Sequence, residues 1–281
     1  MSLPLSHATA VPPSLLAQAP AIHRVGQLDV RLAVSPAEVA AAQALRYQIF
    51  YEEMGARPTA QMAAARRDID PYDAVCDHLL VVDHGLDGSP HVVGTYRLLR
   101  QSVAEAHQGF YSAQEYDLSP LIAQSSPHSQ LLELGRSCVA PAWRNNTTIT
   151  LLWRGIATYL QRHNIGHMFG CASLPGANPL LHAAELSYLH HNHLAPPHLR
   201  ATAHPQNHVP MNQLDAAAID SRAAARALPP LIKGYLRVGA MVGNGGFIDT
   251  QFNTTDVFVV MPVDRITSRY AARFAAANDS N

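Results

Sequence analysis

One apolar segment, residues 131–139, contains a single carboxylate and a single guanidinium, Glu133 and Arg136. Its other residues are mostly apolar or small, which predicts a buried strand. Charged side chains are rarely buried unless they are paired or take part in chemistry. Burial raises the pKa of a carboxyl group, and such a group can take a proton from an amine near neutral pH. We therefore expect Glu133 to be a general base; the alternative is an ion pair with Arg136 that only orders the strand.

Arg136 lies three residues after Glu133, which in a regular strand places the two side chains on opposite faces. A bulge at Gly135 would bring them to the same face. Cys138, two residues further on, could be read as an acyl-accepting nucleophile. Its neighbours include no His in a recognisable arrangement, so the role of a small buried apolar residue is favoured.

A polar segment precedes a helical pattern, and it consists of Arg144, Asn145, Asn146, Thr147 and Thr148. The apolar residues that follow it recur at helical spacing, at Ile149, Leu152, Ile156 and Tyr159. The N–H groups and the dipole at the start of a helix can bind a phosphate group. The plainer alternative is capping of the helix by Asn146 or Thr147, and the two roles are compatible.

Strands and helices alternate along the rest of the chain. Ser35 and Glu38 have the spacing of a capping box, which predicts a helix that ends near Gly55. Other strands are expected at residues 28–34, 78–83, 91–99, 167–172 and 256–261, and turns at 87–88 and 243–246. Other helices are expected from residue 147, at 180–189 and ending near residue 238. This order predicts one α/β domain.

The composition limits the kind of protein. The 281 residues carry a formal net charge of −1, which does not favour nucleic-acid binding. Cys76, Cys138 and Cys171 show neither a disulfide framework nor zinc spacing, so a reducing cytosol is expected. Residues 190–193 include three His but lack a second ligand set, so no metal site is expected. Residues 1–26 are expected to form a flexible N-terminal extension.

Seven segments together resemble the bacterial ornithine N-acyltransferases, the first-step enzymes of ornithine-lipid synthesis. They are residues 46–55, 76–81, 93–99, 132–139, 170–174, 229–239 and 252–258, and they cover most of residues 45–262. The chain is more distantly similar to acyl-homoserine lactone synthases. Those enzymes share an Arg and a Phe on the first helix, an acidic run after it and a Glu-x-x-Arg strand.

The resemblance implies the GNAT acyltransferase fold, an α/β fold with a mixed central sheet flanked by helices, over residues 27–270, with a tail at 271–281. It implies an acyl carrier protein (ACP) thioester on 4′-phosphopantetheine as the donor, and no tightly bound cofactor. The usual Gly-rich pyrophosphate loop is replaced by residues 144–149, as suits a carrier protein that presents one phosphodiester. In related folds a backbone N–H of the Glu-x-x-Arg strand meets the thioester carbonyl, a role carried here to the backbone near Cys138.

The resemblance also gives the acidic run a role. Asp68, Asp70 and Asp73 would by themselves indicate a solvated capping loop. This region lines the acceptor site in the lactone synthases, and a cationic acceptor such as ornithine needs carboxylates for its side-chain ammonium. Arg46 and Arg97 are expected to bind the acceptor carboxylate, since Arg offers paired donors. The alternative for Arg46 is a salt bridge to the acidic run.

The expected activity is transfer of a 3-hydroxyacyl chain from acyl carrier protein to the α-amine of ornithine. Glu133, Arg136 and Cys138, through its backbone, form the expected catalytic group. The amphiphilic product favours a cytoplasmic protein with peripheral contact to the inner membrane. Two alternatives stay open: another amino acid or amine as the acceptor, and a non-catalytic GNAT-like module that binds carrier protein or lipid.

Overall fold

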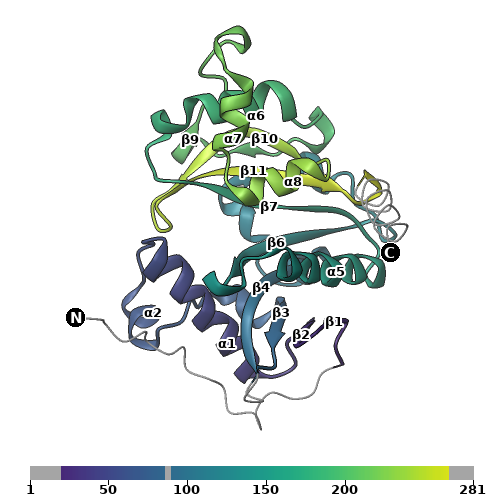
Figure 1. The fold of residues 1–281 in the computed structure, drawn as a ribbon. Helices are drawn as coiled ribbons and strands as arrows, with labels where there is room; N and C mark the ends of the chain where they lie inside the picture. Colours follow the sequence, from purple (N-terminus) through teal and green to yellow (C-terminus); the bar gives the residue numbers. More distant parts are fainter. Residues whose placement is uncertain (1–19, 86–89, 266–281) are drawn as a thin grey trace, which may run out of the picture. The chain divides into compact units, whose positions relative to one another are not determined.

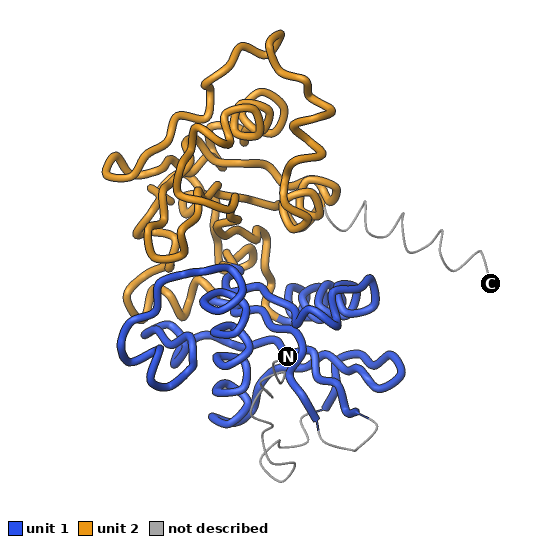
Figure 2. Tube along the Cα trace, turned by 60° about the vertical axis from the view of Figure 1, so that its left-hand side comes forward, with its two compact units in different colours: residues 1–99, 134–162 blue, residues 100–133, 163–281 orange. Residues whose placement is uncertain are grey.

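A computed structural model describes residues 20–85 and 90–265. The predicted turn at 87–88, the predicted tail at 271–281 and residues 1–19 of the predicted extension lie outside the described residues. The chain divides into two compact units, coloured separately in Figure 2: residues 1–99 and 134–162 form the first unit, and residues 100–133 and 163–281 the second. Strand β6, Gln130–Val139, contributes residues to both.

The first unit is built on a sheet with the strand order β1-β2-β3-β4-β6, in which β1 to β4 pair antiparallel (Figure 1). Its further strands are β1 (His23–Val25), β2 (Leu28–Leu32), β3 (Asp77–Asp83) and β4 (His91–Arg100). Its helices and helical turns are α1 (Pro36–Tyr47), η2 (Gln48–Glu53), α2 (Ala60–Ala65), η3 (Pro71–Ala74), η5 (Pro141–Trp143) and α5 (Asn146–Arg162). Residues 23–25, expected within the flexible extension, instead pair with β2, because their backbone groups find partners along that strand.

Local sequence explains where α1 begins. The Ser35 hydroxyl accepts a hydrogen bond from the N–H of Glu38 at 3.3 Å, and the Glu38 carboxylate accepts one from the N–H of Ser35 at 3.2 Å. This is the capping box that the spacing predicts, with Pro36 at the first helical position. The helix continues as a π-helical turn to Glu53, close to the expected end at Gly55.

Successive side chains of β3 point to opposite faces of the sheet, and α1 and α5 pack against these two faces. Leu80 and Val82 pack with Ala42 of α1. Leu79 points to the other face, where a Cβ added to Gly155 of α5 would lie only 3.0 Å from Leu79 Cδ1. Glycine at 155 therefore lets α5 approach the sheet closely, and α1 and α5 cover opposite faces of it.

The second unit continues from β6 in the order β6-β7-β11-β10-β8-β5, and β9 pairs with β10. β6 and β7 run parallel, whereas β7, β11 and β10 are antiparallel neighbours, so the sheet is mixed as expected. The strands are β5 (Tyr116–Asp117), β7 (Ile165–Pro175), β8 (Thr202–Ala203), β9 (His208–Val209), β10 (Met241–Asp249) and β11 (Thr254–Pro262). The α-helices are α3 (Gln101–Ala106), α4 (Ser119–Ile122), α6 (Ala183–His193), α7 (Ser221–Ala227) and α8 (Pro230–Arg237). The short helical turns are η4 (Tyr111–Gln114), η6 (Pro179–His182), η7 (Pro197–Leu199), η8 (Pro205–Asn207) and η9 (Ala216–Ala218).

The turn expected at residues 243–246 is wrong, because these residues lie inside β10. The pairing of β10 with β11 shifts register between Val242 and Gly246. A Cβ on Gly243 would lie 2.7 Å from the Ala201 carbonyl oxygen, and Gly245 has a φ of 84°. The glycines therefore serve close packing and a bulge within a strand, not a chain reversal.

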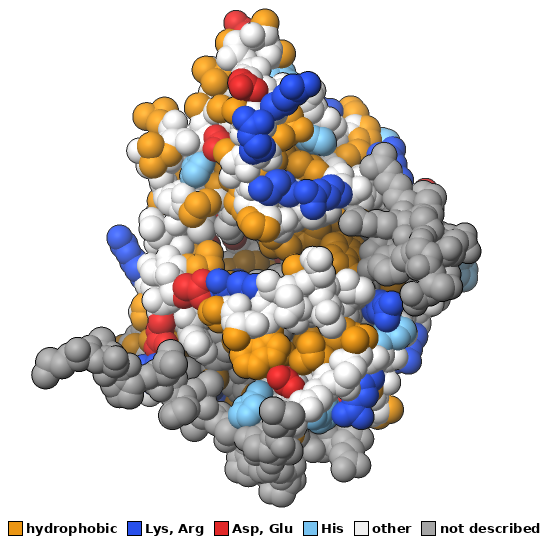
Figure 3. Space-filling model, in the orientation of Figure 1, with side chains coloured by type: hydrophobic (Ala, Val, Ile, Leu, Met, Phe, Trp, Pro, Cys, Tyr) orange, Lys and Arg blue, Asp and Glu red, His pale blue; other side chains and the backbone are white. Residues whose placement is uncertain are grey.

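Aromatic rings fill the core of the second unit. The Phe169 ring lies 4.9 Å from that of Phe110 and 5.5 Å from that of Phe258, and Tyr116 lies 5.4 Å from Phe258. On the surface, Lys and Arg side chains gather where Figure 1 draws α7 and α8 (Figure 3), and those helices carry Arg222, Arg226, Lys233 and Arg237. Among the described residues, no helix combines the length and the apolar character needed to cross a membrane.

Candidate active site

Glu133 is a buried carboxylate of the second unit, only 4% exposed. One of its oxygens accepts hydrogen bonds from both the N–H of Ser112, at 2.7 Å, and the Ser112 hydroxyl. The other oxygen accepts one from the N–H of Tyr111 at 2.7 Å. Tyr111 and Ser112 begin η4, so Glu133 caps that turn from a neighbouring strand. Three such donors stabilise the charged form of a carboxylate and fix its orientation.

Side-chain contacts continue from Ser112 to a second buried acid, Glu115. Cys171 Sγ lies 3.5 Å from Ser112 Oγ and 3.2 Å from a carboxylate oxygen of Glu115. Burial, together with the nearby carboxylate of Asp256, raises the pKa of Glu115 to about 8. Burial also raises the pKa of the Cys171 thiol well above its usual value. At neutral pH both groups therefore hold their protons.

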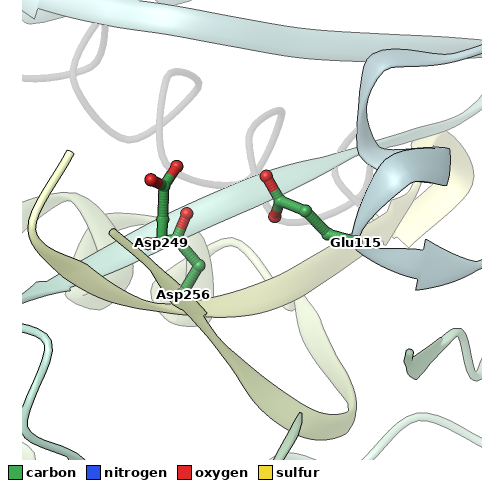
Figure 4. A group of neighbouring side chains, drawn as sticks. All are labelled: Glu115, Asp249 and Asp256. Atoms are coloured by element: carbon green, nitrogen blue, oxygen red, sulfur yellow. The ribbon is translucent and has the colours of Figure 1, made fainter. Parts of the chain in front are cut away.

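Glu115 belongs to a group of three carboxylates. Asp249 ends β10 and Asp256 lies on the adjacent β11, while Glu115 reaches toward both from the end of η4 (Figure 4). One oxygen of each lies within 4.8 Å of the others. No signal in the sequence marks this group, since Glu115 lies more than a hundred residues before Asp249 and Asp256.

The acidic run lies in the first unit, where arginines neutralise it. Arg46 donates to Asp68 at 2.7 Å and to Asp73 at 2.8 Å. Arg97 donates to Asp70 at 2.6 Å. The structure thus brings together all five residues expected to bind the acceptor.

Arg136 joins the same network and balances its charge. Its guanidinium lies 3.1 Å from an oxygen of Asp68 and 3.1 Å from an oxygen of Asp70. Burial alone would raise the pKa of Asp68, but Arg136 and Arg46 outweigh it and the pKa is lowered. Three arginines thus face three aspartates, and the salt-bridge alternative named for Arg46 is present. Asp70 and Arg136, with side chains 13% and 10% exposed, are the least buried members.

The backbone departs from strand geometry at Arg136 and not at Gly135. Arg136 has a φ of 51°, in the left-handed region. The regular alternation of side chains is broken there, one residue after the expected position. Cys138, two residues on, is buried, and burial raises the pKa of its thiol to about 12. A thiol with so high a pKa is not a nucleophile at neutral pH, which supports the interpretation of Cys138 as a small buried apolar residue.

The polar segment before α5 is capped one residue earlier than expected. The side chain of Asn145, not that of Asn146 or Thr147, accepts a hydrogen bond from the N–H of Thr148 at 3.1 Å. The physical reason is that α5 begins at Asn146, so Asn145 is its cap position. Arg144 forms two hydrogen bonds with Glu53, at 2.6 and 2.7 Å, on the exposed surface. Asn146 and Thr147 are exposed.

The architecture and the sequence define a class of protein. Residues 45–154 match the family model of the acetyltransferase (GNAT) domain. Together with the mixed sheet, this match identifies the protein as an acyltransferase with the GNAT fold, as the sequence predicts.

Similarity over most of the chain identifies a particular family within this class. An L-ornithine N(alpha)-acyltransferase of Brucella abortus (strain 2308) is 50% identical over 255 residues, which cover 90% of each chain. One of Agrobacterium fabrum (strain C58) is 48% identical over 253 residues, covering 89% of this chain and 86% of the relative. The chain belongs to this family of L-ornithine N(alpha)-acyltransferases. Among solved structures, the AHL synthase LasI is a remote neighbour, 15% identical, with a TM-score of 0.46 over 84% of this chain and 90% of LasI.

Proposed function

We propose that this protein transfers a 3-hydroxyacyl chain from an acyl carrier protein to the α-amine of ornithine and so forms a lyso-ornithine lipid. The observation that carries the proposal is the similarity to ornithine acyltransferases over nine tenths of both chains. The buried, oriented carboxylate of Glu133 supplies the base that such a reaction needs.

The reaction requires a neutral nitrogen, because an ammonium has no electron pair to attack with. Glu133 takes one proton from the α-ammonium, and the nitrogen then forms a C–N bond to the thioester carbonyl carbon. The C–S bond breaks as the carbonyl re-forms, and the departing thiolate takes the second nitrogen proton. Glu133 later returns its proton to solvent. A backbone N–H near Cys138 is assigned to the carbonyl oxygen while that oxygen carries negative charge.

The donor side is assigned to Arg144, Asn145, Asn146, Thr147 and Thr148. The N–H groups at the start of α5 and the helix dipole favour an anionic phosphate. A single phosphodiester of 4′-phosphopantetheine suits this segment, which has no Gly-rich cradle for a pyrophosphate. The cations of α7 and α8 favour an anionic partner such as an acyl carrier protein. The amphiphilic product also favours contact with the inner membrane surface.

On the acceptor side, Asp70 and Arg136 are the members of the charged network best placed to meet a substrate, since they are its least buried members. Arg46, Asp68, Asp73 and Arg97 hold that network together.

The experiment uses purified protein with L-ornithine and a 3-hydroxyacyl thioester of carrier protein, with the matching coenzyme A thioester in parallel. We expect release of carrier thiol and a product with the mass of the N-acylated amino acid. Glu133→Gln should lose at least about a hundredfold in kcat, the usual contribution of a general base. Full activity in Glu133→Gln would refute the assigned base, and turnover with coenzyme A thioester alone would refute the carrier donor.

A further inference from the structure

We infer that Glu115, Asp249 and Asp256 bind the side-chain ammonium of the acceptor, so that the second unit recognises a diamino acid by its distal amine. This inference rests on the proposed function. It differs from the sequence-based assignment, which gave that ammonium to Asp68, Asp70 and Asp73.

Charge balance separates the two acidic groups. Each aspartate of the first unit's run lies against arginine, so the run has no net charge with which to hold a further cation. The largest charge effects on Glu115, by contrast, come from acidic groups: Asp256, Asp249 and Glu133. Glu115 holds its proton at neutral pH because of this acidic, buried setting, and a cation bound beside it would favour its charged form.

A buried hydroxyl beside these carboxylates is the second observation. Thr254 is 3% exposed, and its Oγ1 has no hydrogen-bond partner among the described residues. The register pairs Thr254 with Asp249 across β10 and β11, and Asp256 lies two residues further along β11. Side chains at these positions stand on the same face of the sheet. Thr254 is thus directed among the carboxylates, and a ligand there would satisfy a group that is costly to bury alone.

The number of acceptors fits a primary ammonium. Such a group has three N–H donors and no acceptor, and three carboxylates converge here. Asp249 is held in place by the N–H groups of Gln251 and Phe252, at 2.7 and 2.9 Å. Glu115 is held through Cys171. The cluster is therefore rigid before any ligand arrives, which lowers the entropy cost of binding.

The distance to the base fits a diamino acid. Glu115 is linked to Glu133 through Cys171 and Ser112 by contacts none of which exceeds 3.5 Å. Five single bonds separate the two nitrogens of ornithine, roughly 6 Å when the chain is extended. Each N–H···O contact adds about 2.8 Å at either end. The linked carboxylate oxygens therefore lie closer together than the full span of an extended ornithine, and a bent side chain would place its α-amine at Glu133 and its distal ammonium at Glu115.

The test compares L-ornithine with L-2-aminopentanoate, which has the same carbon chain and no distal amine. We expect Glu115→Gln and Asp256→Asn to lower the ratio of kcat/KM for ornithine to that for the analogue by about tenfold or more, as loss of a charged hydrogen bond does. Thr254→Val, which keeps the shape, should lower it several-fold. Asp215→Asn, which alters an exposed acid of the same unit, should keep the wild-type ratio. An unchanged ratio in the first three variants would overturn the inference.

Calorimetric titration of the protein with L-ornithine, in a chelator and without donor, gives a readout independent of turnover. Binding to wild type that weakens in Glu115→Gln and Thr254→Val supports the site. Binding that appears only when a divalent metal replaces the chelator overturns it. Failure of wild type to acylate ornithine with any donor would instead refute the proposed function, whereas activity with an unaltered preference in the variants refutes only this site.

Discussion

Glu133 accepts hydrogen bonds from two groups of one residue, the N–H and the hydroxyl of Ser112. The hydroxyl can be removed by substitution, but the N–H cannot. A substitution at Ser112 can therefore remove one hydrogen bond that orients the Glu133 carboxylate while the backbone hydrogen bonds between Glu133 and η4 remain.

Ser112→Ala should lower kcat by roughly tenfold, because a hydrogen bond to a charged group contributes about 1.5–3 kcal/mol. KM for ornithine should change little, since the Ser112 hydroxyl contacts the base. Steady-state rates of thiol release at varied ornithine concentration would measure both. Ser112→Thr, which restores a hydroxyl, should recover most of the rate; a rate in Ser112→Ala equal to wild type would contradict the positioning role.

Arg46→Ala should destabilise the fold by about 3–5 kcal/mol, because it leaves Asp68 and Asp73 charged and buried. Arg144→Ala is the matched control, since Arg144 pairs with Glu53 on the exposed surface, where an ion pair contributes at most about 1 kcal/mol. Urea unfolding of both variants would give the two free energies. Equal losses would contradict the view that burial decides the strength of this network.

Cys138→Ala should keep activity within about twofold, because a thiol whose pKa is raised to about 12 takes no part in acyl transfer at neutral pH. Mass spectrometry of wild type after a single turnover should detect no acylated Cys138. An acyl adduct on this residue, or a large loss of kcat in the variant, would support Cys138 as an acyl-accepting nucleophile.

Stability should fall as pH rises through 8, because the folded protein holds a proton on Glu115 that the unfolded chain loses near pH 4.5. The stabilisation from this proton is complete below pH 4.5, and it is lost above the pKa of Glu115 in the folded protein, about 8. Burial and the carboxylates of Asp256, Asp249 and Glu133 raise the pKa of this group, whereas its hydrogen bond with Cys171 lowers it. Urea unfolding at pH 6 and pH 9 should show a loss on the order of 2 kcal/mol in wild type. Glu115→Gln should show a smaller loss, and equal losses in the two proteins would contradict the assignment.

Local chemistry made much of the first unit predictable. Ser35 and Glu38 determine a helix start through contacts only three residues apart. The apolar, β-branched runs of residues 78–83 and 91–99 predict a pair of strands that the structure contains. The sequence predicts the acidic run as a group and Arg46 as a partner of it, but it does not predict the salt bridges of Arg97 and Arg136. Arg136 reaches it from a strand more than sixty residues away.

The features that the sequence does not predict depend on contacts between distant segments. Gly243 and its neighbours have the composition of a turn, yet they lie in a strand because Ala201 and Phe258 pack against them too closely for any side chain. Glu115, Asp249 and Asp256 come together only when β10, β11 and the end of η4 meet. No periodicity or local spacing marks such a group, whereas the buried carboxylate of Glu133 stood out because its own strand is apolar.

The left-handed backbone of Arg136 has a consequence for substitutions at that position. In this conformation a non-glycine residue has a conformational free energy about 1–2 kcal/mol less favourable than that of glycine. Glycine would relax the main chain, but it would remove one of the two arginines that contact each of Asp68 and Asp70. The conformational preference of the chain and the electrostatic need of its neighbours therefore conflict at this one site, and the arginine shows that the electrostatic need prevails.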